Sequence, residues 1–307
     1  MKKVNVILAA YNGGRHIVKQ LDSIVEQTYP DIDIYIRDDG STDDTVEIVQ
    51  QYIKEYKGNR KIIFLETKEK HLRCPECFYF LAKNCGEADY YAFSDQDDFW
   101  YPQKIEWAVE MLDQEPESVP LVYCCSSEYR TEDGEFIRRF PIQPDTITLG
   151  NVLYYTPASG FTLVFNERAR QEFIIESRTG QELHDKWMLR NAACFGKVIY
   201  DSRIGAQHIR HEQAVTSEDA GNKNLLIHFI KNELMGTAEL EVKRGLQYFY
   251  EEKKEQLAEK DKRMLQIFVK EKCGFTGWLR KVFYPRRLRP RLMGEVAIRI
   301  LFILGRL

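Results

Sequence analysis

The sequence predicts an α/β fold built on a mostly parallel sheet, and three observations support this class. Short apolar runs alternate with segments of helical period through the first hundred residues. The first run, VNVILAA at Val4–Ala10, is almost unbroken, as is typical of a strand buried on both faces. Polar, acidic turns follow the runs. Because ligands of open α/β sheets bind outside the carboxyl ends of the strands, these turns mark the expected site.

The expected elements alternate in a β-α-β-α order along the first hundred residues. After the first strand we expect a helix from 17 that ends before 29, a strand at 32–37, a helix at 43–56, a strand at 61–65, a helix at 76–84 and a strand at 90–93. Short strands near 121–125 and 162–165 and a helix from about 185 to 195 follow in the same domain. Beyond Asn222 the pattern becomes helical.

Charge is distributed unevenly along the 307 residues. The net charge is −3, but residues 270–307 carry ten lysines and arginines against two glutamates, so the remainder is strongly acidic. An acidic body argues against a general nucleic-acid binder, whereas a basic tail that carries aromatic residues is attracted to anionic lipid or phosphate. The apolar stretch 296–304 is interrupted by Arg299, so we expect it to lie on a membrane rather than cross it. Packing of this tail against the core or against a second subunit remains an alternative.

Seven cysteines are spread unevenly through the chain, and its start, MKKVNVILAAY, has no secretory signal. This predicts reduced thiols in the cytoplasm. Cys74 and Cys77 form a lone CxxC motif. A structural zinc site would need a second pair at similar spacing, and the sequence offers none.

Three carboxylates, Asp95, Asp97 and Asp98, follow the strand expected at 90–93. They would repel one another unless a cation lay among them. Mg²⁺ or Mn²⁺ prefers oxygen ligands and is often held by one or two carboxylates together with substrate phosphate. The alternative is a solvated acidic loop that caps the helix near Pro102.

Three motifs in order, VNVILAAYNGG, IRDDGSTDDT and FSDQDDFWYPQK, resemble the family 2 glycosyltransferases with the GT-A fold. The resemblance covers roughly residues 3–210, and the third motif is most similar to bacterial members that add rhamnose or related sugars to cell-surface polysaccharides. It implies a GT-A domain over 1–222, with a nucleotide-binding half at 1–100 and an acceptor half at 101–222. A helical, basic region over 223–307 would follow and associate with a membrane.

The resemblance assigns six residues to the nucleotide sugar: Tyr11, Asp38, Asp39, Asp95, Asp97 and Asp98. Tyr11 would flank the base and Asp39 would accept a hydrogen bond from it. Asp95 would lie near the ribose and help to hold the metal, and Asp97 would ligate the metal on the diphosphate. An ordinary turn with helix-capping residues would also explain the sequence around Asp39.

His184-Asp185-Lys186-Trp187 resembles the family's ED-type motif, in which the aspartate is the general base of inverting members. Asp185 is the expected catalytic residue, although His184 stands where many relatives have glutamate. A first-turn acid that interacts with the helix dipole is the structural alternative.

Gln207-His208 resembles the end of the family's Arg-Gln-His segment, with Ala206 in place of the arginine. His208 is a candidate ligand for the metal or the diphosphate, and an unliganded loop histidine is the alternative. Arg203, Arg210 or His211 could replace the missing arginine.

The expected activity is transfer of a sugar, with rhamnose as one candidate, from a UDP- or dTDP-sugar to a hydroxyl of a growing, lipid-linked glycan. The enzyme would invert the anomeric centre, depend on Mg²⁺ or Mn²⁺, and lie on the cytoplasmic face of the membrane, with a homo-oligomer left open. A nucleotidyltransferase and a non-catalytic scaffold that binds glycan or lipid are the alternatives. A dehydrogenase is disfavoured because no GxGxxG follows the first strand.

Overall fold

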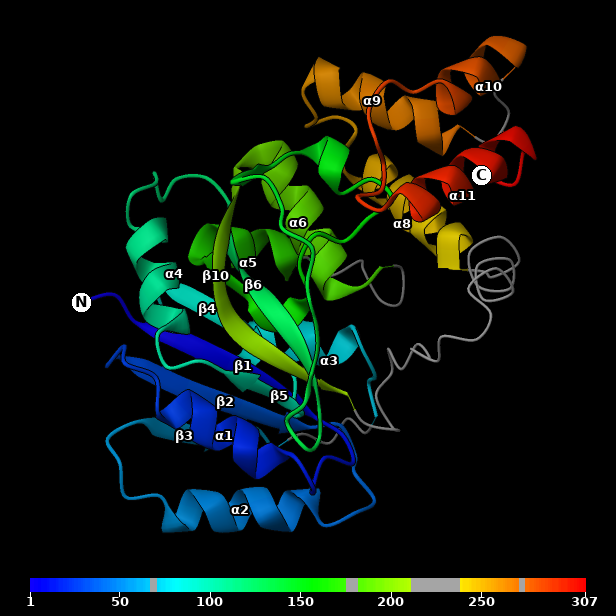
Figure 1. Ribbon diagram of the computed structural model, residues 1–307. Helices are drawn as coiled ribbons and strands as arrows, with labels where there is room; N and C mark the ends of the chain where they lie inside the picture. Colours follow the sequence, from blue (N-terminus) through cyan, green and yellow to red (C-terminus); the bar gives the residue numbers. More distant parts are fainter. Residues whose placement is uncertain (67–70, 175–181, 211–237, 271–273) are drawn as a thin grey trace. The chain divides into compact units, whose positions relative to one another are not determined.

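The protein is described by a computed structural model that covers residues 1–66, 71–174, 182–210, 238–270 and 274–307 (Figure 1). These residues fall into two compact units. The first lies within Met1–Ile147 and Ala158–Ser217, and the second within Thr148–Pro157 and Glu218–Leu307. The predicted boundary at residue 222 lies outside the described residues.

The first unit is organised around a mixed sheet with the strand order β3-β2-β1-β4-β9-β6-β10-β5, with β7 paired to β6 and β8 to β10. The strands are β1 (Val4–Ala10), β2 (Ile32–Asp38), β3 (Lys61–Phe64), β4 (Tyr90–Ser94), β5 (Asp98–Trp100), β6 (Leu121–Thr131), β7 (Phe136–Arg139), β8 (Thr146–Ile147), β9 (Leu163–Asn166) and β10 (Lys197–Arg210). Strands β1 to β4 are parallel, and β9 is antiparallel to both β4 and β6. Strands β6 and β10 therefore run in the same direction as β4.

Helices cover both faces of this sheet (Figure 1). Helices α1 (Ile17–Val25), α2 (Thr45–Glu55) and α4 (Lys104–Leu112) pack into one apolar core with alternate residues of the strands, such as Val6 and Leu8 of β1. Helices α3 (Glu76–Asn84), α5 (Glu167–Phe173) and α6 (His184–Phe195) pack on the other strand residues. These three layers confirm the predicted α/β class.

Most predicted elements are confirmed to within one or two residues, although β6 extends six residues beyond its predicted end. The sequence pattern does not predict α5, β5, β7, β8 or β10. β10 carries Asp201-Ser202-Arg203 in its interior, and its register against β6 shifts between Asp201 and Ile204. This irregularity interrupts the alternation that would reveal a strand. β10 carries His208, one of the residues that the sequence predicts to bind the metal or the diphosphate.

The second unit is helical. It consists of α8 (Ala238–Lys253), α9 (Glu259–Val269), α10 (Phe275–Val282), α11 (Leu292–Ile303) and the segment Thr148–Pro157 with its short helix η1 (Leu149–Asn151). Tyr154 of that segment makes edge contacts with Phe268 and Phe302, at 5.6 Å between ring centroids in both cases. Among the described residues, no helix is long and apolar enough to cross a membrane.

Candidate active site

The predicted site residues follow strands that end at one edge of the sheet. In the parallel register, Ala10 of β1 lies beside Asp38 of β2, and Leu8 of β1 lies beside Ser94 of β4. Tyr11, Asp39 and Asp95 come directly after these strands. The carboxyl ends of three parallel strands thus bring together residues that are more than eighty positions apart in the chain.

Gln96 connects the loop after β4 to the loop after β1. Its side chain accepts a hydrogen bond from the backbone N–H of Tyr11 and donates one to the Tyr11 carbonyl, both at 2.8 Å. A Cβ atom on Gly13 would lie 2.0 Å from Oε1 of Gln96, so the glycine leaves room for this side chain. Gln96 stands inside the acidic motif, but no pattern in the sequence predicts a role for it.

Asp38 stabilises the turn that follows β2. Its carboxylate accepts hydrogen bonds from the backbone N–H groups of Gly40 and Ser41, both at 2.9 Å, and from the Ser41 hydroxyl. Gly40 has a φ of 89°, a conformation that favours glycine. A turn role for Asp38 is therefore present, in line with the alternative drawn from the sequence.

Asp39 is buried and organises the loop at 71–73. Its carboxylate accepts hydrogen bonds from the backbone N–H groups of Leu72 (2.8 Å) and Arg73 (2.6 Å), and it pairs with the buried Arg37. His71 lies 4.7 Å from Tyr11 between ring centroids. Tyr11 and His71 thus form an aromatic pair beside Asp39, and His71 is a contributor that the sequence pattern does not reveal.

The carboxylates after β4 lie within electrostatic range of one another. Burial and the charges of Asp98, Asp97 and Asp185 raise the pKa of Asp95 well above its ordinary value. Burial raises the pKa of Asp98 to about 6, although a hydrogen bond from His208 opposes that rise. This concentration of negative charge would be relieved by a bound cation.

Asp98 on β5 and His208 on β10 face each other across paired strands. Nδ1 of His208 lies 2.9 Å from Oδ1 of Asp98. Burial by itself lowers the pKa of His208, but the hydrogen bond and charge of Asp98 outweigh that effect and raise it. Lys104 is fully buried nearby, with Nζ 3.4 Å from the centroid of the Trp100 ring, and burial lowers its pKa to about 8.

The residues present fit a hard divalent cation in part. Oδ2 of Asp98 is buried and has no hydrogen-bond partner among the described residues. The carboxylates of Asp95 and Asp97 lie within electrostatic range of it. In the part of the chain that the structure describes, no group of three or more His, Cys, Asp or Glu side chains is arranged as a complete metal site. One or two carboxylates with donor phosphates and water form a common Mg²⁺ site, which this arrangement allows.

Asp185 is in the first turn of α6 and lies within electrostatic range of Asp95. The segment before it is anchored by a buried ion pair between Glu182 and Arg190. Asp185 of α6 and the acidic cluster after β4 therefore lie within electrostatic range of each other, although they come from different elements of the first unit.

The proposed replacements for the missing arginine lie in different places. Arg203 pairs with Asp201 and stacks on Trp107, at 4.5 Å to the ring centroid. Arg210 lies 5.5 Å from the centroid of the Tyr129 ring, near the end of β10. His211 lies outside the described residues.

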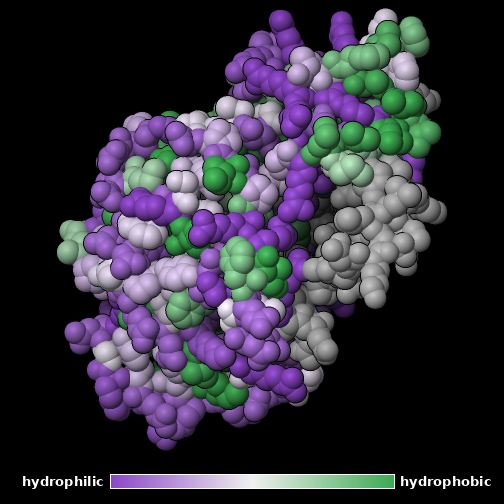
Figure 2. Space-filling view, in the orientation of Figure 1, coloured by the Kyte–Doolittle hydropathy of each residue, from purple (hydrophilic) through white to green (hydrophobic). Residues whose placement is uncertain are grey.

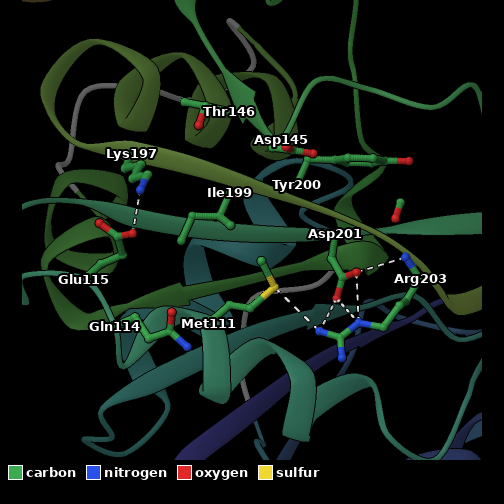
Figure 3. A pocket seen from close by; sticks show the side chains of 11 residues that line it. Met111, Gln114, Glu115, Asp145, Thr146, Lys197, Ile199, Tyr200, Asp201 and Arg203 are labelled. Carbon is green, nitrogen blue, oxygen red and sulfur yellow. Dashed lines mark hydrogen bonds and ion pairs between the residues drawn. The ribbon is translucent and has the colours of Figure 1, made fainter.

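A separate pocket of about 430 Å³ lies beside the amino-terminal half of β10 (Figure 3). Lys197 pairs there with Glu115, and Arg203 pairs with Asp201. Both basic side chains of the lining are therefore neutralised by acidic partners, and Asp145 adds one further carboxylate to the lining. None of the residues predicted to bind the nucleotide sugar lines it.

The fold and this carboxyl-edge site define a GT-A type transferase. Residues 5–164, slightly more than half of the 307-residue chain, match the family described as Glycosyl transferase family 2, and the chain belongs to this family. The family prediction and the fold prediction are both confirmed.

Two relatives illustrate the similarity in sequence. The dTDP-rhamnosyl transferase RfbG of Shigella flexneri is 41% identical over 107 residues, which cover 34% of this chain and 36% of that protein. The Escherichia coli protein WfaP, named UDP-Glc:alpha-D-GlcNAc-diphosphoundecaprenol beta-1,3-glucosyltransferase, is 31% identical over 170 residues, or 54% of this chain and 61% of that protein. The chain thus matches less than two thirds of either relative.

Solved structures support the fold. S. aureus TarS 1–349 in complex with UDP is 15% identical, with a TM-score of 0.56 and coverage of 99% of this chain and 91% of that one. The Pyrobaculum calidifontis mannosyltransferase PcManGT, in complex with GDP-Man and Mn2+, is 14% identical with a TM-score of 0.53, covering 98% of this chain and 87% of that one. At these identities the likeness concerns the fold alone.

Proposed function

We propose that this chain is an inverting glycosyltransferase that moves a sugar from a UDP- or dTDP-sugar to a hydroxyl of a growing, lipid-linked cell-surface glycan. The observation that carries the proposal is the grouping of Asp95, Asp97 and Asp98 with Asp185 at the carboxyl edge of the sheet. A donor diphosphate and an acceptor hydroxyl need such groups on opposite sides of one anomeric carbon.

The nucleoside would lie against Tyr11, with Asp39 as the acceptor for the base and His71 as a second aromatic wall. The contact between the rings of Tyr11 and His71, and the hydrogen bonds from loop 71–73 to Asp39, support this arrangement. Asp38 would act indirectly, through the turn that it stabilises. Asp95 would lie near the ribose.

Asp97 and Asp95 would hold Mg²⁺ or Mn²⁺ together with the donor diphosphate. When bound, the cation would neutralise charge that develops on the leaving diphosphate. Metal-binding histidines usually donate their other ring N–H to a carboxylate, and the contact between His208 and Asp98 has this form. Asp98 would thus orient His208.

Asp185 would act as the general base. A carboxylate beside the acceptor hydroxyl can take its proton as the oxygen attacks the anomeric carbon. The position of Asp185 within electrostatic range of Asp95 supports this role beside the proposed donor. Attack from the side opposite the leaving diphosphate would invert the anomeric configuration.

The names of the two relatives guide the choice of substrates. RfbG is named a dTDP-rhamnosyl transferase, and WfaP is named for a diphosphoundecaprenol-linked acceptor. We therefore propose dTDP-rhamnose as the first donor to test and an undecaprenyl-diphosphate-linked saccharide as the first acceptor class.

A product assay tests the proposed reaction. Purified protein is incubated with dTDP-rhamnose or UDP-glucose, the lipid-linked saccharide and Mn²⁺, and the released nucleotide is identified. We expect a nucleoside diphosphate and a glycan longer by one sugar. Release of pyrophosphate would indicate a nucleotidyltransferase, and the absence of any turnover with a full panel of nucleotide sugars would indicate a binding protein.

We further propose that the second unit holds the enzyme on the cytoplasmic face of an anionic membrane. Large apolar side chains that are 42–74% exposed gather on α10, α11 and the residues beside them (Figure 2): Phe275, Phe283, Leu292, Met293, Val296, Ile303 and Leu304. Five exposed arginines accompany them: Arg280, Arg286, Arg287, Arg291 and Arg306. The one acidic residue of this stretch, Glu295, is buried and pairs with Arg299. A surface that is apolar and basic suits an anionic bilayer.

Vesicle sedimentation tests this membrane surface. Each arginine near an anionic leaflet contributes about 1 kcal/mol, so Arg286→Ala with Arg287→Ala should weaken binding to phosphatidylglycerol vesicles by about 30-fold. Arg263→Ala, which removes an exposed cation from α9, is the matched control and should bind normally. Equal binding of all three proteins, or equal binding to phosphatidylcholine vesicles, would contradict the proposal.

A further inference from the structure

His184 is a buried residue that directly precedes the proposed base, and the reaction described above gives it no role. It is 6% exposed and lies at the start of α6. Its neighbours come from four other parts of the first unit: the loop before α3, α3 itself, strand β4, and the short helix η2 (Gly160–Thr162).

Aromatic rings hold the imidazole on two sides. Phe78 of α3 stacks on it at 4.0 Å between centroids with an interplanar angle of 26°. Phe93 of β4 makes an edge contact at 4.8 Å. Phe93 is two residues before Asp95, so the imidazole packs directly against the strand that presents the acidic cluster.

Gly160 closes the third side. A Cβ atom at this position would lie 2.3 Å from Nε2 of His184, so any other residue would displace the ring. Nε2 is buried and has no hydrogen-bond partner among the described residues. The imidazole thus fills a slot whose width depends on a glycine.

The remaining nitrogen contacts the loop that shapes the donor side. Nδ1 of His184 lies 3.5 Å from Sγ of Cys74, one residue after the segment that donates to Asp39. Burial lowers the pKa of His184 to about 4 and raises that of the Cys74 thiol, so both groups are uncharged near neutral pH. Their contact is therefore a hydrogen bond between two uncharged groups.

We propose that His184 is a positioning residue, which fixes the carboxylate of Asp185 relative to Asp95 by bridging α6 to β4 and to the Cys74 loop. This inference rests on the proposed role of Asp185 as the base. A displacement of about 1 Å can lower the rate of a reaction about 100-fold. If the first turn of α6 were not held in place, kcat would therefore fall while the affinity for the donor stayed the same.

Two substitutions test the bridge. His184→Phe keeps a ring in the slot but removes the contact with the thiol, and Cys74→Ala removes the same contact while leaving the imidazole in place. For His184→Phe we expect kcat for transfer to fall at least tenfold, with the Kd for the nucleoside diphosphate and Mn²⁺ within twofold of wild type. For Cys74→Ala we expect about a threefold fall in kcat. The double variant should lose no more than His184→Phe alone.

Phe173→Leu is the matched control, because Phe173 contacts Phe93 at 5.3 Å in the same aromatic cluster. It should lower the Tm and leave kcat within twofold. A kcat of His184→Phe within twofold of wild type would overturn the inference, as would a parallel loss of donor affinity. If His184→Phe does not fold, an unchanged kcat in Cys74→Ala overturns it.

A further variant separates this inference from the proposed function. Asp185→Asn removes the proposed base itself. If Asp185→Asn retains turnover, the assigned base is wrong. If Asp185→Asn abolishes transfer while His184→Phe and Cys74→Ala do not change kcat, only the positioning role of His184 fails.

Discussion

The two halves of β10 carry charged side chains in different electrostatic settings. In the amino-terminal half, which lines the 430 Å³ pocket, Lys197 and Arg203 are matched by Glu115 and Asp201. In the carboxyl-terminal half, His208 faces an acidic cluster in which the pKa of Asp98 is raised to about 6 by burial. The charges on the amino-terminal half are neutralised by their partners, whereas the carboxyl-terminal half lies beside a concentration of carboxylates.

This difference in charge between the two halves of β10 indicates that a pocket alone does not identify a functional site. Matched ion pairs near a surface contribute little and leave no demand for a ligand. Carboxylates that raise one another's pKa store an unfavourable interaction that a cation or a protonated substrate group can relieve. The carboxyl half of β10 is therefore the expected place for chemistry, although the other half has the defined pocket.

The largest difference in kcat should come from two aspartate substitutions, one beside the acidic cluster and one in the pocket beside the amino-terminal half of β10. We expect Asp185→Asn to lower kcat by about 1,000-fold, since a positioned general base contributes roughly 10²- to 10⁴-fold. Asp201→Asn, at the pocket end, should lower the Tm through loss of its Arg203 pair but keep kcat within twofold. Initial rates at saturating donor measure both, and equal losses of kcat would remove the distinction between the ends.

The second largest difference should appear in the dependence on Mn²⁺ of variants at the acidic cluster and at the pocket. Asp97→Asn is expected to reduce kcat/KM by about 100-fold, or about 2.7 kcal/mol, and to abolish the Tm increase that a nucleoside diphosphate produces with Mn²⁺. Removal of Mn²⁺ with a chelator should reproduce the loss in the wild type. Glu115→Gln, at the pocket end, serves as the control. A Mn²⁺-dependent shift that survives in Asp97→Asn would show that the ligand assignment is wrong.

The fold should also be acid-sensitive because of His184. Its pKa in the folded chain is about 4, against an ordinary value of 6.5, so the unfolded chain binds the extra proton between these values. The contribution of His184 to the free energy of unfolding is therefore complete above pH 6.5 and is lost as the pH falls toward 4. The loss is about 2 kcal/mol between pH 6.5 and about pH 4.5. Urea unfolding at the two pH values should show this component in the wild type, and His184→Phe should lack it.

The smallest expected effect concerns the link between the β1 and β4 loops. Gly13→Ala must displace Gln96 and break its two hydrogen bonds to Tyr11. We expect the donor KM to rise about tenfold, as for the loss of two hydrogen bonds of modest net value. Gln96→Ala should give a similar rise, and the double variant should not be worse. Additive effects of the two substitutions would mean that Gly13 acts in another way.

The first half of the sheet and its part of the site could be predicted because the sequence patterns that indicate them lie within short segments of the chain. Buried parallel strands give continuous apolar runs, and each run is followed by the polar residues that the strand presents at its carboxyl end. Tyr11, Asp39 and Asp95 follow such runs, and the family resemblance assigns their roles. The order and direction of β1, β2 and β4 then place them at one edge.

The remaining parts of the site depend on pairings that no local pattern reveals. Asp98 meets His208 only because β5 pairs with β10, and neither strand shows clear alternation. His71 and Cys74 reach the site through a loop that is organised by Asp39. Lys104 is read from the sequence as the end of a motif, whereas the structure buries it against Trp100.

In the basic tail, too, the sequence alone does not show which charged side chains are exposed. Lys281 and Arg299 contribute to the charge count from the sequence, but the structure uses both internally. Nζ of Lys281 donates to the carbonyl of Leu307, and Arg299 donates to the carbonyls of Lys281 and Val282. The cations left for a membrane are therefore fewer than a count of the sequence suggests.

Anomalous diffraction from Mn²⁺ in crystals grown with a nucleoside diphosphate tests the central claim most directly. We expect one manganese peak within bonding distance of a carboxylate oxygen of Asp97 or Asp95 and of the diphosphate, with the base against Tyr11. A manganese and nucleotide bound away from these aspartates, or a nucleotide seated in the pocket beside Lys197 and Asp201, would contradict the proposed chemistry.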